Sequence, residues 1–151
     1  MNRRSALQLA AVLTGAFLLP LQAFAGKSEI FTGLVEGVGA GGFDVVSYQA
    51  GTPVEGKPEF TTKWKGAEWR FASAENRDAF AAAPETYAPQ FGGYCAFAVS
   101  KGATAKGDPK VWTVVDKKLY FNFNEAVQTN WKEDIPGNIS KAESNWPKVL
   151  N

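Results

Sequence analysis

The sequence contains no histidine, and it has one cysteine and one methionine in 151 residues. Histidine is the commonest general base and the commonest metal ligand, so its absence excludes Ser–His and Cys–His nucleophilic sites. The single cysteine, Cys95, excludes an internal disulfide and leaves too few soft ligands for a tight copper or zinc site within one chain. Packing must therefore stabilise the protein, and five tryptophans and eleven phenylalanines supply large side chains for a core. A ligand platform for a sugar or an aromatic molecule is the alternative use of the tryptophans.

The chain also lacks any run of basic residues. Sixteen Lys and Arg, two of them within the first four residues, stand against fifteen Asp and Glu, so nothing indicates binding to nucleic acid or to an anionic membrane surface. The acidic residues are scattered singly except for Glu133 and Asp134. Adjacent residues on a helix point apart, so this pair is expected to be a solvated helix end. We therefore expect a non-catalytic protein, with an enzyme of unknown reaction as an alternative.

Residues 1–25 have the three parts of an export signal peptide. A mostly apolar run follows Arg3 and Arg4, and Ala23-Phe24-Ala25 offers small residues for cleavage. The paired arginines, followed by Leu7, are typical of a twin-arginine signal. We expect cleavage after the last of these alanines, a periplasmic or otherwise extracytoplasmic location, and no stable membrane anchor in the mature protein. An uncleaved anchor is the alternative.

The mature chain is predicted to be a single α+β domain with a small antiparallel sheet made from two β-hairpins and three to four short helices. Residues 26–58 are a glycine-rich N-terminal segment that includes a strand-like stretch at 43–48, and residues 59–151 are the α+β domain itself. The first hairpin turns at Lys65-Gly66-Ala67, between two segments with alternating polarity. Ser73 is placed to cap the helix that follows, which should end near Ala83.

The second half of the domain is predicted to contain a buried strand at 94–99 and then another hairpin. This hairpin turns at Asp116-Lys117-Lys118. Asn124 is placed to cap a helix that Pro136-Gly137 ends, and a last helix stops at Pro147. The sequence shows no evident internal repeat.

Several of these segments resemble the YHS domain family. The core of the resemblance is Trp69-Arg-Phe71-Ala-Ser73, followed by Phe80 and by Pro84-Glu-Thr-Tyr87. Further motifs resemble the exported bacterial branch of the family: Gly42-Phe-Asp44-Val-Val-Ser-Tyr48, Gly92-Gly-Tyr-Cys95, Asp108-Pro109, Trp112, Leu119-Tyr120 and Asn145-Trp146-Pro147. The resemblance covers nearly the whole mature chain. Lys117 stands where the family usually carries glycine.

The resemblance raises metal binding as a hypothesis, because YHS domains attached to heavy-metal transporters are thought to bind metals. In those relatives two thiols lie at the start of the helix that follows the hairpin, and the matching positions here hold Ala72 and Asn76. Alanine cannot bind a metal, and asparagine is a poor ligand for a soft ion. The Tyr-His-Ser tripeptide that names the family is also missing. We therefore expect no cofactor and no metal, with Cys95 as the one candidate ligand left.

Four residues are candidates for ligand contact: Asp44, Tyr48, Tyr94 and Cys95. The Asp44 carboxylate could instead cap local backbone N–H groups. The two tyrosines could line a pocket or complete a hydrogen bond in the core. Cys95 lies in an apolar run, where strand alternation would bury it as a small hydrophobic side chain rather than expose it as a reactive thiol.

The sequence therefore predicts an exported, non-catalytic binding or accessory module of the YHS family. Its partner would be an unidentified small molecule or protein. The main alternative is a metal-binding or thiol-redox module centred on Cys95 and completed across a dimer.

Overall fold

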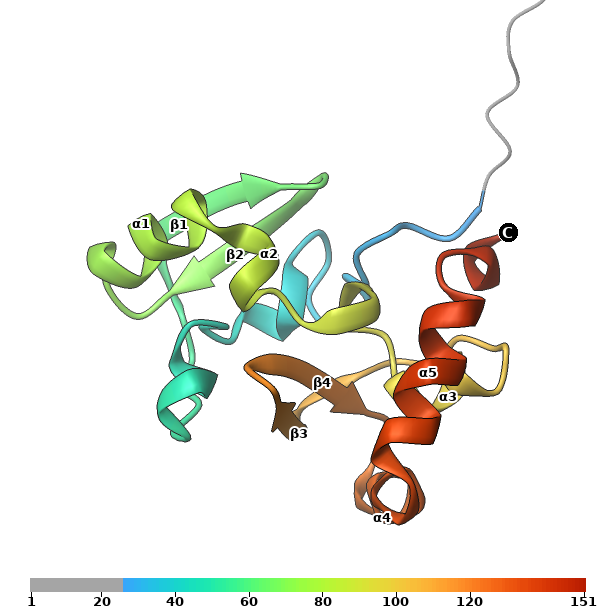
Figure 1. Cartoon of the computed structure of the whole chain (residues 1–151). Coiled ribbons are helices and arrows are strands. Elements are labelled where there is room, and N and C mark those ends of the chain that lie inside the picture. The colour runs from blue at the N-terminus through green and yellow to red at the C-terminus, as the bar shows by residue number, and fades with distance from the viewer. Residues whose placement is uncertain (1–25) are drawn as a thin grey trace, which may run out of the picture.

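The structure, a computed structural model, describes residues 26–151, which form two β-hairpins with short helices packed around them (Figure 1). The predicted export signal, residues 1–25, lies outside the described residues. The predicted α+β class is confirmed. Each hairpin forms a two-stranded antiparallel sheet of its own, so the two hairpins do not join into one sheet. Five α-helices lie within the described part of the chain.

The first hairpin pairs β1 (Lys57–Trp64) with β2 (Ala67–Phe71). Trp69 and Phe71 share the buried face of β2, as the sequence predicted. Ala67, which was predicted to belong to the turn, is instead the first residue of β2 and lies on the same face. α1 (Ala74–Ala82) follows, and the Ser73 hydroxyl accepts a hydrogen bond of 3.1 Å from the Asn76 N–H at its start. The predicted cap is therefore confirmed. A single further turn, α2 (Pro84–Tyr87), completes this half.

The second hairpin pairs β3 (Asp108–Val115) with β4 (Lys118–Asn122). α4 (Glu125–Glu133) follows it, and the Asn124 side chain accepts a hydrogen bond of 2.8 Å from Val127 N–H, which confirms the second predicted cap. α4 gives way at Asp134 to α5 (Ile135–Asn145). Pro136 lies in the first turn of α5, where a missing N–H costs no helical bond, so it begins this helix rather than ending the previous one.

The second half of the domain repeats the backbone of the first at a constant spacing of 51 residues. The first residue of β3 (108) lies 51 residues after the first residue of β1 (57). The same difference separates the starts of β4 (118) and β2 (67), and those of α4 (125) and α1 (74). The 3-10 turns η1 (Gly39–Gly42) and η3 (Gln90–Gly93) have the same spacing. The expectation of no internal repeat is therefore wrong. We call residues 39–87 the first unit and residues 90–145 the second unit.

Positive φ angles at matching positions of η1 and η3 support this equivalence. Successive φ values are 52°, 59° and 85° at Ala40, Gly41 and Gly42, and 57°, 63° and 84° at Phe91, Gly92 and Gly93. Left-handed backbone is uncommon outside glycine, so its recurrence at matching positions indicates the same local fold. The two isolated bridges Phe43–Glu55 and Tyr94–Lys106 match in the same way.

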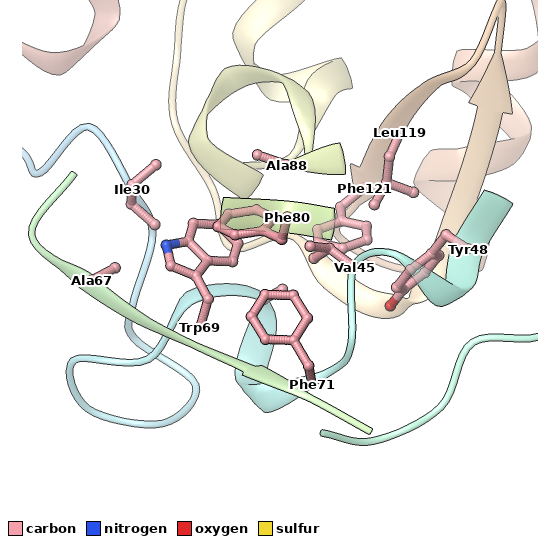
Figure 2. Packing of buried hydrophobic residues seen from close by; sticks show 11 residues of the cluster. Ile30, Val45, Tyr48, Ala67, Trp69, Phe71, Phe80, Ala88, Leu119 and Phe121 are labelled. Atoms are coloured by element: carbon pink, nitrogen blue, oxygen red, sulfur yellow. The ribbon is translucent and has the colours of Figure 1, made fainter. Parts of the chain in front are cut away.

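Two apolar cores lie on opposite sides of β4. The first core packs Trp69, Phe71 and Phe80 of the first unit together with Leu119 and Phe121 of β4 (Figure 2). The ring centroids of Trp69 and Phe80 are 5.2 Å apart, and Trp69 is buried as predicted. The second core contains further large side chains: Phe91, Tyr94, Val99, Tyr120 and Trp131. Alternate residues of β4 therefore face different cores, and β4 joins the two units.

Two predicted strands are wrong. In the 43–48 stretch, the Asp44 carboxylate accepts the Val46 N–H and the chain enters the 3-10 turn η2 (Ser47–Ala50). In the 94–99 stretch, the Val99 N–H donates to the Cys95 carbonyl and the chain forms α3 (Ala96–Ser100). Short apolar runs do not distinguish a strand from a buried helical turn, and local hydrogen bonds decide here. The chain ends in a last 3-10 turn, η4 (Lys148–Leu150).

Candidate functional site

Asp44 is fully buried, and its carboxylate is saturated by donors from the first unit. It accepts hydrogen bonds from the Val46 N–H at 2.9 Å, the Ala72 N–H at 2.9 Å and the Asn76 side-chain amide at 2.7 Å. Ala72 and Asn76 are the two positions that the sequence resemblance matches to thiols of metal-binding YHS domains. In this chain both donate to Asp44, so the arrangement joins the loop of the first unit to the start of α1. These are the contacts of a capping carboxylate.

Cys95 occupies the position equivalent to Asp44 in the second unit, since the two residues are 51 apart. Its side chain is buried, with 1% of the residue exposed, and Sγ lies 3.6 Å from Oδ1 of Asn122. The strand alternation that was expected to bury it is absent, and the start of α3 buries it instead. An external reagent therefore has no direct path to the sulfur.

The two candidate tyrosines connect distant parts of the chain. Tyr48 is buried and its hydroxyl donates to the Pro109 carbonyl at 2.7 Å. Burial, with smaller contributions from the carboxylates of Asp108 and Asp44, raises the pKa of Tyr48 above its usual value. The Tyr94 hydroxyl donates to the Ser28 carbonyl at 2.7 Å, and burial raises its pKa as well. Both phenols are neutral hydrogen-bond donors that hold the fold together.

The four sequence-predicted candidates do not meet in one pocket. Asp44 and Tyr48 lie in the first unit, Tyr94 and Cys95 lie in the second, and none of them lines either of the two cavities described below. The side chains of all four form hydrogen bonds within the fold.

A cavity of about 330 Å³ lies where the N-terminal segment, the two units and the C-terminal end of the chain meet. We call it the junction cavity. Its wall is partly aromatic and partly charged, and the side chains and backbone that line it are Glu29, Ile30, Trp64, Lys65, Glu85, Ala88, Pro89, Gln90, Phe91, Gly92, Lys118 and Trp146.

Two partly exposed indoles form the aromatic part of the junction cavity. Trp64 packs at its back against Trp69 and Phe80 of the first core, with ring centroids 5.9 Å and 5.8 Å away. Trp146 packs against Phe91 and Tyr94 beside the second core, at 5.9 Å and 6.2 Å. Each ring is thus fixed from behind by a different core. A ligand would meet walls that need little ordering on binding.

The charged part of the junction cavity contains two acids and two bases. Lys65 forms an ion pair with Glu29 at 2.5 Å, and its ammonium lies 4.8 Å from the centre of the Trp64 ring. Glu85 and Lys118 are exposed, and neither belongs to an ion pair in residues 26–151. The lining therefore includes one acidic and one basic residue without an ion-pair partner in residues 26–151, beside the two indoles.

The backbone at the junction cavity is unusual at Phe91. Phe91 has φ of 57°, a left-handed conformation that a bulky side chain rarely adopts. Gly92 follows with φ of 63°, and a Cβ there would collide with the Glu29 carbonyl. The N-terminal segment is held against this turn by the Phe31 N–H, which donates to the Gly92 carbonyl at 2.9 Å. Ala40, the equivalent residue of the first unit, has the same left-handed backbone, so this conformation belongs to the repeated turn and brings the Phe91 ring to the cavity.

A second cavity, of about 270 Å³, lies among the helices of the second unit and is lined mainly by polar side chains: Phe97, Lys101, Asn130, Glu133, Asp134, Asn138 and Lys141. It has one aromatic ring, and Lys101 covers that ring at 4.9 Å. Glu133 and Asp134 are exposed as predicted.

Sequence reasoning missed the junction cavity. Its residues come from six separate places in the chain, and no local motif connects them. The one available signal was the number of tryptophans, for which a ligand platform was considered beside core packing. In the structure Trp69 and Trp131 are buried in the cores, whereas Trp64 and Trp146 line the junction cavity.

No three His, Cys, Asp or Glu side chains converge on a common point within residues 26–151. No helix of this part of the chain is long and apolar enough to cross a bilayer. Comparison with protein-family models, with curated proteins and with solved structures gave no match. The resemblance to the YHS domain family therefore rests on the sequence motifs alone.

Proposed function

We propose that the mature chain is an exported, non-catalytic binding module of the YHS type, which holds a small molecule in the junction cavity. The observation that carries this proposal is the pair of partly exposed, rigidly supported indoles, Trp64 and Trp146, next to unpaired charges in a cavity of about 330 Å³. Small-molecule sites combine apolar walls with a few polar groups that orient the ligand, and this cavity has both.

A non-catalytic role is supported by where the reactive groups lie. Asp44 and Cys95 are buried and bonded within the fold, and the chain has no histidine to act as a general base. The alternative of a metal-binding or thiol-redox module requires Cys95 to meet a ligand, which its burial opposes. An enzyme of unknown reaction is the third hypothesis.

Export by the twin-arginine route is part of the proposal and rests on Arg3, Arg4 and the alanines before Gly26. Replacing both arginines by lysine should trap the precursor in the cytoplasm. Unchanged export of that variant would exclude this route.

The binding role is tested with two matched tryptophan variants. Trp64 and Trp112 are both half-buried and both pack against the first core, but only Trp64 lines the junction cavity. Protein purified from its export compartment should carry a small molecule detectable by native mass spectrometry. Trp64→Ala should lose this molecule, whereas Trp112→Ala should keep it. Absence of any bound molecule in the parent, or equal retention by both variants, would overturn the proposal.

A further inference from the structure

We infer that the junction cavity takes a zwitterion with a large apolar body, of the kind represented by a free amino acid with an aromatic or bulky aliphatic side chain. This inference rests on the proposed function and specifies the chemistry of its ligand.

The size of the cavity limits the ligand to a small molecule. Small-molecule sites span roughly 300–1,000 Å³, and the junction cavity, at about 330 Å³, lies at the lower end of this range. The cavity is open to solvent, so a larger molecule would fill it and extend beyond it. A single amino acid fits this scale.

The aromatic walls select an apolar body. Trp64 and Trp146 are anchored by the two different cores, so their spacing is set by the fold rather than by the ligand. Ile30 and Phe91 add apolar surface between them. Aromatic and aliphatic groups gain both buried area and ring contacts in such a setting.

The charged residues that line the cavity favour a ligand that carries one positive and one negative charge. Lys65 and Glu29 already neutralise each other at 2.5 Å, and this leaves Lys118 and Glu85 as the lining charges without an ion-pair partner in the described residues. Lys118 can bind a carboxylate, and Glu85 can bind an ammonium group. A ligand with only one charge would satisfy one of them. A phosphate or other multivalent anion is disfavoured, because two carboxylates line the same cavity.

The experiment uses four probes that differ in one feature each. Phenylalanine carries both charges and an apolar body, 2-phenylethylamine lacks the carboxylate, 3-phenylpropionate lacks the amine, and glycine lacks the apolar body. Binding to the ligand-free mature protein is measured by titration calorimetry and by the indole N–H signals in NMR spectra. Phenylalanine should bind about fivefold or more tighter than 2-phenylethylamine and 3-phenylpropionate, a factor typical of one partly exposed charge-assisted contact. It should also bind about fivefold or more tighter than glycine, because glycine buries no apolar side chain against the indoles.

Variants of the two charged residues then test which residue binds the carboxylate of the ligand and which binds its ammonium group. Lys118→Gln should abolish the advantage of phenylalanine over 2-phenylethylamine, and Glu85→Gln should abolish its advantage over 3-phenylpropionate. Lys132→Gln and Glu75→Gln remove one exposed charge each outside the cavity and serve as matched controls, which should change nothing.

The outcomes separate this inference from the proposed function. Equal binding of phenylalanine and its singly charged analogues, or variants that fail to discriminate between them, would overturn the zwitterion inference while leaving a binding cavity in place. Failure of all four probes to bind would also overturn it. In that case the native mass spectrometry of the compartment-purified protein still decides whether the cavity binds another molecule.

Discussion

Asp44 and Cys95 stand at equivalent positions, and the two units use different side chains for the same local task. In the first unit the Val46 N–H donates to the carboxylate of Asp44. In the second unit the equivalent donor is the Phe97 N–H, and it is accepted at 3.4 Å by the amide oxygen of Asn122, the residue equivalent to Phe71. A thiol is a weak acceptor, so the Asn122 amide oxygen takes the place of the carboxylate, and the Cys95 thiol donates to the same oxygen at 3.6 Å.

Burial of Cys95 leads to a prediction about its reactivity. The folded protein should react slowly with a thiol reagent near neutral pH and rapidly once unfolded in denaturant, because only 1% of the residue is exposed. The measurement is the labelling rate with and without denaturant. Cys95→Ser should also leave any bound molecule in place. Fast labelling of the folded protein, or loss of a bound metal in Cys95→Ser, would move the metal or thiol-redox hypothesis ahead of the binding module.

Trp69 provides a second prediction at the scale of one residue. It is 1% exposed and packs against the tilted ring of Phe80, so Trp69→Ala should lower the free energy of unfolding by about 3–5 kcal/mol. Denaturant titration measures this change. Trp112→Ala, in which the removed ring is only half-buried, should cost less. If Trp69→Ala melts at the temperature of the parent, the ring is not part of the core.

At the scale of elements, the two hairpins use the same two-residue turn. Lys65 and Gly66 have φ of 48° and 76°, and Asp116 and Lys117 have φ of 50° and 64°. Such turns match the twist of the strands and favour Asn-Gly or Asp-Gly, because both central residues are left-handed. Lys117 is thus in a conformation that suits glycine, at a local cost in stability.

The turn of the second hairpin therefore predicts a stabilising substitution. Lys117→Gly creates an Asp-Gly turn and should raise the free energy of unfolding by about 0.5–1 kcal/mol, the relief of left-handed strain less the entropy cost of glycine. The Gln49 side chain bonds the Lys117 carbonyl, which the substitution keeps. Lys110→Gly, at an exposed position within β3, should instead destabilise by a similar amount. A melting temperature for Lys117→Gly at or below that of the parent would contradict the turn assignment.

Elements with local signals could be predicted from the sequence. Alternation at Trp69 and Phe71, the turn at Lys65-Gly66, and the caps at Ser73 and Asn124 all depend on near neighbours. The stretches at 43–48 and 94–99 could not be predicted, because they are short apolar runs placed after left-handed turns. In the first stretch the Asp44 carboxylate accepts the nearby Val46 N–H and also the distant Ala72 N–H. In the second stretch the Phe97 N–H donates to the amide oxygen of Asn122, which lies in β4.

At the scale of the whole molecule, the duplication could not be recognised from residue types. The matching positions that keep their identity are mostly glycine and proline, such as Gly56 and Pro58 with Gly107 and Pro109. A Cβ on Gly56 would collide with the Arg70 backbone, and one on Gly107 would collide with the Gly93 carbonyl. Close backbone approach thus requires glycine at this position in both units, while the core side chains differ. The junction cavity depends on how the units pack, so no part of it was visible in the sequence as a motif.

The shared interior predicts that neither unit folds alone. Leu119 and Phe121 of the second unit complete the first core, and the Tyr48 hydroxyl of the first unit bonds the Pro109 carbonyl of the second. A fragment of residues 26–89 therefore exposes apolar surface and lacks a buried partner for Tyr48. We expect it to show no cooperative thermal transition by circular dichroism, whereas the chain of residues 26–151 unfolds in one step.

The matched fragment, residues 90–151, should likewise be unfolded, because the face of β4 that carries Leu119 and Phe121 would have nothing to pack against. Mixing the two fragments should restore the spectrum of the uncut chain, since every contact between the units is then available again. A cooperative transition in either fragment alone would show that its core is sufficient by itself. The junction cavity would then lie between two independent domains, and its walls would no longer be fixed by one continuous interior.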